Sequence, residues 1–590
     1  MHNSIRIFLM IPLSTSYPYS YFTYTFPHAI LCLENNKLTR EDWVIMKVLV
    51  IGGVAAGTKV AAKLKRECPQ CQVQILTKGM DISYAGCGLP YYVGHVIENR
   101  AELVVNTPAA FTDLTGAQVR TGVEVTALDR TSKTVTAKDL TTGEVFFEGY
   151  DKLVIATGAH SFVPKCEGTD LENVFFLRTP DDAVALREKV DAGEIKRAVI
   201  VGGGFIGLES AENLASMGVK VSVIDFAPHV LPELLDPEFS TYVENAMADA
   251  GVMPFTGVAL EGIVGNGKVE KVLTSRRPMK ADAVLLAMGF RPNTEFLQDS
   301  GLEMFKGTLL VDGSMRTNDP DIYAAGDCAL VTNRITGARQ WSAMGSTANI
   351  AGRLAATRIA GETGDPYPGV LGTGVAKLPG IQMARTGLTE TAAKKAGYEV
   401  ESVVTVTDDK AHYYPGSGSF LTKMICEKSS HRLLGLQVLG KGAVDKMADI
   451  AVTAISMKAT LEDLQNCDFA YAPPFSTAIH PFAVTINALL NKLSGAFETF
   501  TPAEYAAGAA EGYRMIDASI QPSIPGVPYV DLTKVTGPVD GLDPQEKLLL
   551  VCSKGKRAYL LQNRLKYYGY TNTKVLEGGT LFNTEVISSN

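Results

Sequence analysis

The stretch "KVLVIGGVAAGTKVAAKLKRE", residues 47–67, decides the fold of this chain. Its first residues predict a buried strand, its glycines predict a tight turn, and the alanine-rich remainder predicts a helix that begins within the turn. In such a unit the backbone amides at the helix N-terminus approach a pyrophosphate, and the helix dipole favours the anion. The predicted nucleotide contacts of this turn are Gly52, Gly53, Val54, Ala55 and Gly57.

A second copy of the unit occupies residues 197–225, "RAVIVGGGFIGLESAENLASMGVKVSVID". Here Gly202, Gly204 and Gly207 complete the GxGxxG pattern, and Asp225 ends the following strand. An acidic residue at this place hydrogen-bonds ribose hydroxyls and repels a 2′-phosphate. The second unit therefore predicts NADH as its ligand, with NADPH as the alternative.

The first unit is less regular than the second. Val54 occupies the middle glycine position, and Thr77 stands where the acidic residue would end the next strand, "QVQILT". A threonine hydroxyl holds the ribose less well than a carboxylate does. Two further stretches, "KLVIATGA" (152–159) and "IYAAGDCA" (322–329), are predicted strands that end in small residues suited to a nearby cofactor. Their predicted cofactor contacts are Thr157, Gly158, Gly326 and Asp327, the last meeting a ribityl or ribose hydroxyl.

Composition narrows the class of protein. The chain has 590 residues, 46% of them hydrophobic, which allows three or four domains. A net charge of −8 without a long basic run argues against nucleic acid or a membrane surface as partner. No apolar run reaches the roughly 18–20 residues of a membrane helix. Residues 1–45 are expected to be an unstructured or misassigned extension, with Met46 as the biological start.

Nine cysteines are too few for a disulfide scaffold, and their odd number fits a reducing cytoplasm. Cys68 and Cys71 form a single CxxC, so zinc is not expected, and two ordinary thiols between a helix and a strand are predicted. Cys87 lies alone between glycines in "SYAGCGLPYYVG", residues 83–94. Tyr91 and Tyr92 stand where a second redox thiol would be.

Read together, these motifs resemble the flavoprotein pyridine-nucleotide disulfide oxidoreductases over about residues 46–500, and the segment around Cys87 resembles the coenzyme A disulfide reductases. The resemblance implies FAD and NADH as cofactors and a substrate thiol as the partner of Cys87. A helix starting near Leu89, together with the flavin, is expected to lower the pKa of the Cys87 thiol. The residues expected to hold coenzyme A are Lys59, Lys63, Arg66 and Ser83.

The resemblance also implies an α/β fold with four domains and a homodimer. The expected ranges are 46–160 and 290–370 for FAD binding, 161–289 for NAD(P)H binding, 371–500 for an α+β dimerisation domain, and 501–590 for a small α/β tail. Tyr413, Tyr414 and Tyr471 are expected to reach the active site of the other subunit. The chain departs from the family at Ile479 and His480, where a Lys-Asp pair is common.

The tail carries a second thiol in "LLLVCSKGKRAYLL", residues 548–561. A predicted strand ends at Cys552, a loop that closes with Arg557 curls around the sulfur, and a helix with apolar Ala558, Leu560, Leu561 and Leu565 follows. This segment resembles a rhodanese domain. The domain looks shortened between Ser519 and Ile524, and Ser519 stands where an arginine is common.

The fusion favours sulfane sulfur as substrate: coenzyme A persulfide or polysulfide, beside coenzyme A disulfide. Two alternatives stay open from the sequence. One is an NADH oxidase or peroxidase in which Cys87 cycles through a sulfenic acid. The other is a non-catalytic redox sensor that binds nucleotide.

Overall fold

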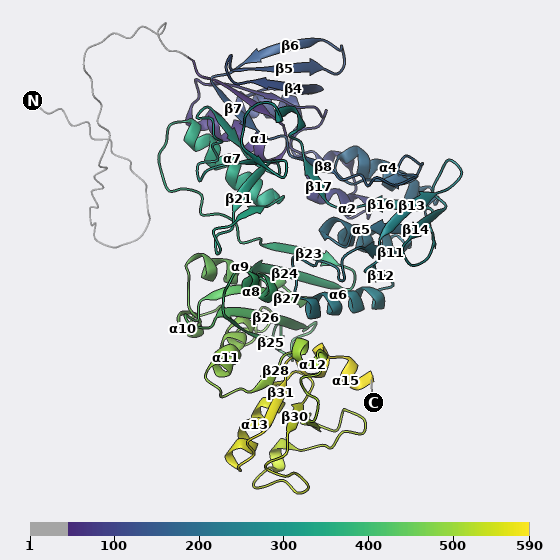
Figure 1. Cartoon of the computed structure of the whole chain (residues 1–590), viewed down its shortest axis with the longest axis vertical. Helices are drawn as coiled ribbons and strands as arrows, with labels where there is room; N and C mark the ends of the chain where they lie inside the picture. Colours follow the sequence, from purple (N-terminus) through teal and green to yellow (C-terminus); the bar gives the residue numbers. More distant parts are fainter. Residues whose placement is uncertain (1–44, 589–590) are drawn as a thin grey trace, which may run out of the picture. The chain divides into compact units, whose positions relative to one another are not determined.

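The computed structural model describes residues 45–588, so the expectation for residues 1–45 lies almost wholly outside the described part. The first sheet is parallel, and β1 runs beside β2 in the register Lys47 to Gln72 and Ile51 to Leu76. Helices α1 and α7 pack against each other beside this sheet (Figure 1). In sheet order the strands are β20 (Ile322–Ala324), β7 (Lys152–Ile155), β1 (Lys47–Ile51), β2 (Gln72–Leu76) and β3 (Gln118–Arg120), and the helices are α1 (Ala55–Glu67), α2 (Leu89–Val93), α3 (Pro108–Thr115) and α7 (Gly345–Ile359).

The second sheet repeats the arrangement, because the sequence at 197–225 repeats the strand–turn–helix–strand pattern. All its strands are parallel, and four of the five residues of β10 are buried. In sheet order the strands are β12 (Met253–Thr256), β11 (Lys220–Asp225), β10 (Arg197–Val201), β16 (Ala283–Leu286) and β9 (Val174–Phe175), and the helices are α4 (Pro180–Asp191), α5 (Phe205–Ser216) and α6 (Pro237–Asp249).

The third sheet is antiparallel and has helices packed against it. Every residue of β27 is buried, which requires cover on both faces of the sheet. In sheet order its strands are β23 (Gly374–Leu378), β24 (Ile381–Gly387), β27 (Leu433–Gly440), β26 (Ser419–Glu427) and β25 (Val400–Asp408). Its helices are α8 (Glu390–Lys395), α9 (Val444–Ser456), α10 (Leu461–Gln465) and α11 (Pro481–Leu493).

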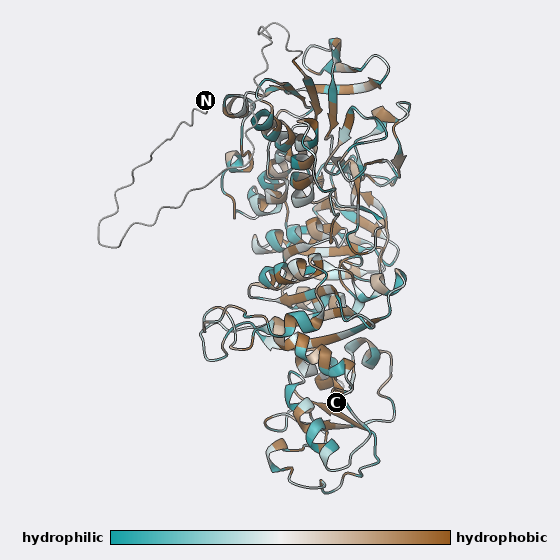
Figure 2. Cartoon of the chain, turned by 90° about the vertical axis from the view of Figure 1, so that its left-hand side faces the viewer, coloured by the Kyte–Doolittle hydropathy of each residue, from teal (hydrophilic) through white to brown (hydrophobic). Residues whose placement is uncertain are grey.

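The tail forms a four-stranded parallel sheet, which begins at Thr499, just before residue 501. One hydrophobic core is shared between this sheet and the third sheet, and Figure 2 shows hydrophobic residues concentrated along the strands. Of the four apolar residues noted in the helix after Cys552, Leu560 is 44% exposed, whereas Ala558, Leu561 and Leu565 are buried. The elements are β28 (Thr499–Phe500), β31 (Thr573–Leu576), β30 (Leu548–Val551), β29 (Arg514–Asp517), α12 (Pro502–Ala506), α13 (Lys556–Tyr567), α14 (Gly579–Phe582) and α15 (Glu585–Ser588).

Further short strands complete the described chain, and all but one of their pairings are antiparallel. β8 (Ala159–Ser161) pairs with β17 (Phe290–Pro292) where the chain passes from the first sheet to the second and back. No helix between residues 45 and 588 is both long and apolar enough to cross a membrane. The remaining strands are β4 (Val123–Asp129), β5 (Thr134–Asp139), β6 (Val145–Gly149), β13 (Leu260–Val264), β14 (Lys271–Thr274), β15 (Met279–Lys280), β18 (Met304–Phe305), β19 (Thr308–Leu310), β21 (Ala329–Thr332) and β22 (Arg339–Trp341).

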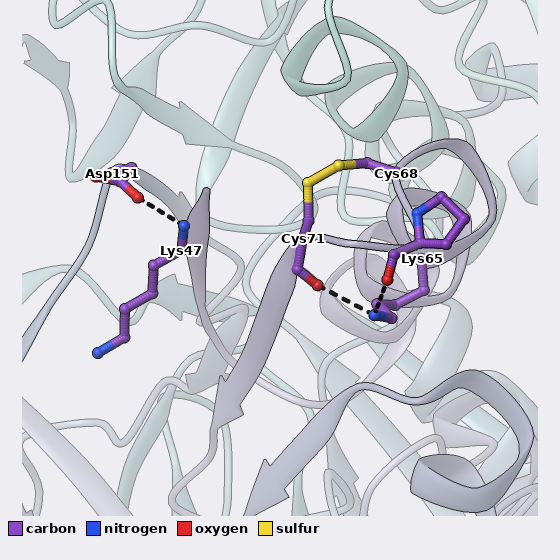
Figure 3. The surroundings of a disulfide bond; sticks show 6 residues. Lys47, Lys65, Cys68, Cys71 and Asp151 are labelled. Carbon is purple, nitrogen blue, oxygen red and sulfur yellow. Dashed lines mark hydrogen bonds between the residues drawn. A yellow bond between two sulfur atoms is a disulfide. The ribbon is translucent and has the colours of Figure 1, made fainter. Parts of the chain in front are cut away.

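Cys68 and Cys71 are joined by a disulfide, so the prediction of two ordinary thiols is wrong (Figure 3). Cys68 caps the C-terminus of α1, and the two-residue turn to Cys71 brings their Cα atoms to 5.5 Å, within bridging range. The ammonium of Lys65 donates hydrogen bonds to the carbonyls of Pro69 and Cys71, at 2.6 and 3.1 Å, and so holds the same turn. The location between helix and strand is as predicted.

Candidate functional site

A cavity of about 2000 Å³ lies against both glycine turns. It gathers most of the predicted cofactor residues from the first two sheets. Gly57 and Gly207 do not line it. The lining includes Gly52, Gly53, Val54, Ala55, Thr77, Thr157, Gly158, Gly202, Gly204, Asp225, Gly326, Asp327 and Cys87.

Gly57 and Gly207 serve helix packing instead of lining the cavity. A Cβ on Gly57 would lie 1.9 Å from the Gly52 carbonyl oxygen, and one on Gly207 would lie 2.0 Å from that of Gly202. Only glycine lets each helix approach its strand this closely, as expected of the third glycine of the pattern.

The turn at Gly204 fits a dinucleotide. A Cβ built there meets no atom within 4 Å, so the backbone at the N-terminus of α5 faces open cavity with room for a pyrophosphate. Asp225 is held at the end of β11, since its carboxylate accepts hydrogen bonds from the amides of Gly203, at 2.6 Å, and Ala227, at 2.7 Å. The carboxylate is thereby placed for ribose hydroxyls.

The end of the cavity at the first glycine turn, where the motif is irregular, contains an acidic side chain from another strand. Thr77 is 7% exposed at the end of β2. The sequence analysis missed Glu124 on β4, which lines the cavity and pairs with Lys78 at 2.8 Å. A carboxylate therefore lines the same cavity as Thr77, which stands after β2 in place of an acidic residue.

Asp327 makes an ion pair that the sequence analysis also missed. Its Oδ2 accepts a hydrogen bond from Nη2 of Arg178 at 2.9 Å, and Arg178 lies over the Phe290 ring at 4.9 Å. Arg178 follows β9 of the second sheet, and Asp327 follows β20 of the first. The pair therefore joins the two dinucleotide-binding sheets across the cavity.

Cys87 lies exposed in the same cavity, on a single helical turn just before α2. Burial raises the pKa of its thiol, the carboxylates of Glu209 and Asp327 raise it further, and Arg178 opposes them. The surroundings of Cys87 in the protein therefore act against the lowering of this pKa that was expected from the helix together with the flavin. Tyr91 donates a hydrogen bond to Glu209 at 3.0 Å, and Glu209 was not singled out in the sequence.

A second cavity, of about 790 Å³, lies along α1. Of the four residues expected to hold coenzyme A, Lys59, Arg66 and Ser83 line it. Lys63 does not, because it forms an ion pair with Glu67 one turn away on its own helix. Lys65 also lines this cavity, although it is not among the residues expected from the sequence.

The three predicted tyrosines belong to two loops of the third domain that touch each other. The Ala411 amide donates to the Pro473 carbonyl at 3.3 Å. A hydrogen bond with Tyr413 raises the pKa of Tyr471. Tyr413, Tyr414 and Tyr471 are 67%, 39% and 49% exposed, so they are free to meet another molecule.

Residues 46–348 match the pyridine nucleotide-disulphide oxidoreductase family, and residues 377–483 match the dimerisation domain of that family.

The chain belongs to the pyridine nucleotide-disulphide oxidoreductase family.

Members of this family are FAD- and NAD(P)H-dependent oxidoreductases, so the expectations of an enzyme with these cofactors and of a dimerisation domain are confirmed. A relative from Pyrococcus abyssi, an NAD(P)H sulfur oxidoreductase (CoA-dependent), is 35% identical and covers 75% of this chain and 98% of its own length. An NADH oxidase from Methanocaldococcus jannaschii is 33% identical, over 76% of this chain and 100% of its own. A solved NAD-dependent persulfide reductase from A. fulgidus is 34% identical with a TM-score of 0.86, and covers 91% of this chain and 100% of its own.

A second solved structure, reduced Bacillus anthracis CoADR-RHD, covers 93% of this chain and 99% of its own length, with 32% identity and a TM-score of 0.87. The matched 93% corresponds to about 549 of the 590 residues, whereas only 483 residues precede the end of the dimerisation match. The structural similarity to CoADR-RHD therefore extends into the tail of the present chain.

The tail encloses Cys552, which is 2% exposed. Its Sγ accepts a hydrogen bond from the Ala558 amide at 3.4 Å, so the loop does curl around the sulfur. Arg557 instead donates to the Ala518 carbonyl at 3.2 Å. The segment after β31 covers the loop, because the Thr580 amide donates to the Cys552 carbonyl at 3.0 Å.

The covering segment is itself anchored on helix α6, which packs beside the second sheet. The ring of Phe582 lies 5.1 Å from that of Phe239 and 5.5 Å from that of Tyr242, both on α6. Lys554, in the Cys552 loop, forms an ion pair with Asp408 at the end of β25. The Cys552 loop is therefore docked against the dimerisation domain.

Ile479 and His480, which stand where the family commonly has a Lys-Asp pair, differ in burial. Ile479 is 63% exposed, whereas His480 is 5% exposed and caps α11, its Nδ1 accepting a hydrogen bond from the Phe482 amide at 3.2 Å. Burial lowers the pKa of His480 to about 4, and Lys446 adds to the effect. His480 is thus a neutral helix cap.

Proposed function

We propose that this enzyme reduces coenzyme A disulfide, coenzyme A persulfide or polysulfide, with Cys87 as the reacting thiol and NADH as the preferred nucleotide. The observation that carries the proposal is the position of Cys87: one exposed thiol, in the cavity that both glycine turns line, next to a cavity lined with cations. The sulfur and persulfide reductases among the relatives support it. When bound, FAD supplies to this site the two electrons that NAD(P)H delivers as hydride.

The chain's own chemistry is thiol exchange at Cys87. Its thiolate attacks one sulfur of the substrate disulfide, a new S–S bond forms to Cys87, and the other half leaves as a thiolate that takes up a proton. Since the neighbouring carboxylates raise the pKa of Cys87, the thiolate has to be formed against their charge. Tyr471 and Tyr414 of a second copy are the groups we assign to the leaving thiolate.

Coenzyme A is assigned to the smaller cavity. Lys59, Lys65 and Arg66 supply cations for its phosphates, and Ser83 supplies a hydroxyl. Lys63 is left out of this set because Glu67 neutralises it.

The tail is assigned the delivery of sulfane sulfur through Cys552, as a rhodanese-like domain. The curled loop and the extent of the likeness to CoADR-RHD support this assignment. Because Cys552 is buried, the covering segment 577–582 has to open before the thiol accepts sulfur.

A second candidate is an NADH oxidase, with Cys87 as a sulfenic acid that oxygen or peroxide forms and NADH-derived electrons reduce. The NADH oxidases from Methanocaldococcus jannaschii and Enterococcus faecalis among the relatives, at 33% and 34% identity, favour it. A single exposed thiol in the larger cavity suits either reaction.

The deciding experiment is anaerobic NADH oxidation by the FAD-loaded enzyme. Coenzyme A disulfide, coenzyme A persulfide and polysulfide are offered in parallel to the wild type, Cys87→Ser, Cys552→Ser and Cys467→Ser. Cys467 is the matched control, because it is exposed and lines neither cavity. We expect turnover that Cys87→Ser abolishes and Cys467→Ser leaves unchanged, and a loss in Cys552→Ser confined to polysulfide. Failure of all three acceptors, with NADH oxidised once oxygen is admitted, would establish the oxidase.

A further inference from the structure

The two cavities meet at one bulky side chain. Val54, Ala55 and Tyr84 line both the larger cavity that contains Cys87 and the smaller cavity along α1. Val54 and Ala55 are small or medium in size, whereas the Tyr84 ring is large. Tyr84 therefore accounts for most of the bulk at the boundary.

The backbone around Tyr84 is fixed on both sides. Tyr84 forms an antiparallel bridge with Val104, and the Ala85 amide donates to the Leu103 carbonyl at 2.7 Å. Leu103 is completely buried. The ring therefore has a rigid support, and the boundary does not open by movement of a free loop.

The Tyr84 side chain is also neutral. Burial raises the pKa of its hydroxyl, and the carboxylates of Asp182, Asp327 and Asp81 raise it further against the effect of Arg178. The hydroxyl consequently stays protonated at neutral pH, so the boundary contributes bulk and no charge.

We propose that Tyr84 determines substrate specificity as a wall between the coenzyme A cavity and Cys87, which admits a slender thiol-bearing chain and obstructs a bulky disulfide. The inference rests on the proposed function, because it concerns how a substrate reaches Cys87 from the cavity in which Lys59 and Arg66 are assigned to the coenzyme A phosphates. Such a substrate brings its sulfur to Cys87 through the gap that the ring leaves. Removing the ring widens this gap without removing an anchor.

The first test compares two acceptors on the FAD-loaded enzyme: coenzyme A disulfide and the bulky aromatic disulfide 5,5′-dithiobis(2-nitrobenzoate). In Tyr84→Ala we expect kcat/KM for the aromatic disulfide, relative to coenzyme A disulfide, to rise about tenfold, the scale of steric discrimination in a pocket. Tyr84→Phe keeps the ring and is expected to behave as the wild type, as is Tyr567→Ala, an exposed tyrosine on the tail. An unchanged ratio in Tyr84→Ala, or the same rise in Tyr84→Phe, overturns the proposal.

The second test needs no turnover. Cys87 of the NADH-reduced enzyme is alkylated with N-ethylmaleimide or with fluorescein maleimide, and its modification is followed by peptide mass spectrometry. Tyr84→Ala is expected to accelerate the bulky reagent about tenfold more than the small one. Where Tyr84→Ala fails to retain FAD, Tyr84→Trp serves, with the opposite expectation. Equal effects on both reagents overturn the proposal that Tyr84 forms a wall. A size-dependent effect in an enzyme that reduces no coenzyme A substrate refutes the proposed function and leaves the wall in place.

Discussion

The hydroxyl of Tyr91 donates a hydrogen bond to Oε1 of Glu209 at 3.0 Å. Tyr91 lies on α2, which follows Cys87, and Glu209 lies on α5, which follows the second glycine turn. The contact therefore ties the thiol segment to the nucleotide-binding helix, and it places a carboxylate close enough to raise the pKa of Cys87.

Glu209→Gln is expected to lower the pKa of Cys87, since it removes the negative charge that opposes the thiolate. The shift is measured from the pH dependence of Cys87 alkylation by iodoacetamide. Tyr91→Phe is the matched control, because it removes the hydrogen bond and keeps the carboxylate. A Cys87 pKa that stays the same in Glu209→Gln would contradict the assignment.

Lys423 is the cation of a buried cluster that joins the start of helix α6 to the third sheet. Its ammonium lies 2.5 Å from Glu238, 2.8 Å from Glu390 and 3.1 Å from Asp236, and its side chain is 4% exposed. Burial raises the pKa of Glu390, but Lys423 outweighs this and lowers it to about 2. Because this folded pKa lies below the usual 4.5, the pairing stabilises the fold above pH 4.5 and the stabilisation is lost as pH falls towards 2.

Lys423→Met is therefore expected to lower the free energy of unfolding by about 3–5 kcal/mol at pH 7, because it leaves buried carboxylates without their counter-charge. The difference from wild type should shrink on acidification, as the carboxylates take up protons. Urea unfolding at pH 7 and pH 4 measures both values. Lys394→Met removes an exposed lysine from the same Glu390 and should cost about 0–1 kcal/mol.

The sequence predicts the strands and glycine turns well because their signals are local. A buried strand, a glycine with no room for a Cβ and a helix start all lie within ten residues, as at Gly202 and Gly207. Contacts between distant segments carry no such signal. Arg178 and Asp327 are 149 residues apart, and Tyr91 and Glu209 are 118 apart, so neither pair is visible before the chain is folded.

Local patterns also mislead where a neighbour competes. Lys63 is among the residues expected to hold coenzyme A, yet it forms an ion pair with Glu67 one turn later on the same helix. A CxxC without a second pair predicts free thiols, but the helix end and the following turn bring Cys68 and Cys71 together. The loop motif places Cys552 in its curled loop. It does not describe residues 577–582, the segment that covers this loop in the structure.

Asp225→Asn is expected to raise the ratio of kcat/KM for NADPH to that for NADH by about tenfold, because it removes the charge that repels a 2′-phosphate. The asparagine oxygen still accepts a hydrogen bond from one of the two amides, of Gly203 and Ala227, that hold the carboxylate. Initial rates with each nucleotide measure the ratio. Glu233→Gln, a carboxylate that also lines the cavity, is the control for a general charge effect. An equal rise in both variants would show that the preference does not depend on Asp225.

His480→Asn is expected to make the fold less sensitive to acid. The pKa of His480 in the folded chain is about 4, below its usual 6.5, so its neutral ring stabilises the fold above pH 6.5 and that stabilisation is lost as pH falls through 6.5 towards 4. The loss amounts to up to about 3 kcal/mol at 1.4 kcal/mol per pKa unit. Asparagine is a good helix cap with no proton to take up, so it should match wild type within about 1 kcal/mol at pH 7 and exceed it at pH 4. His480→Ala loses the cap of α11 and should be less stable than wild type at pH 7. Urea unfolding followed by circular dichroism separates these cases, and the same pH dependence in wild type and His480→Asn would show that the ring is not buried in its neutral form.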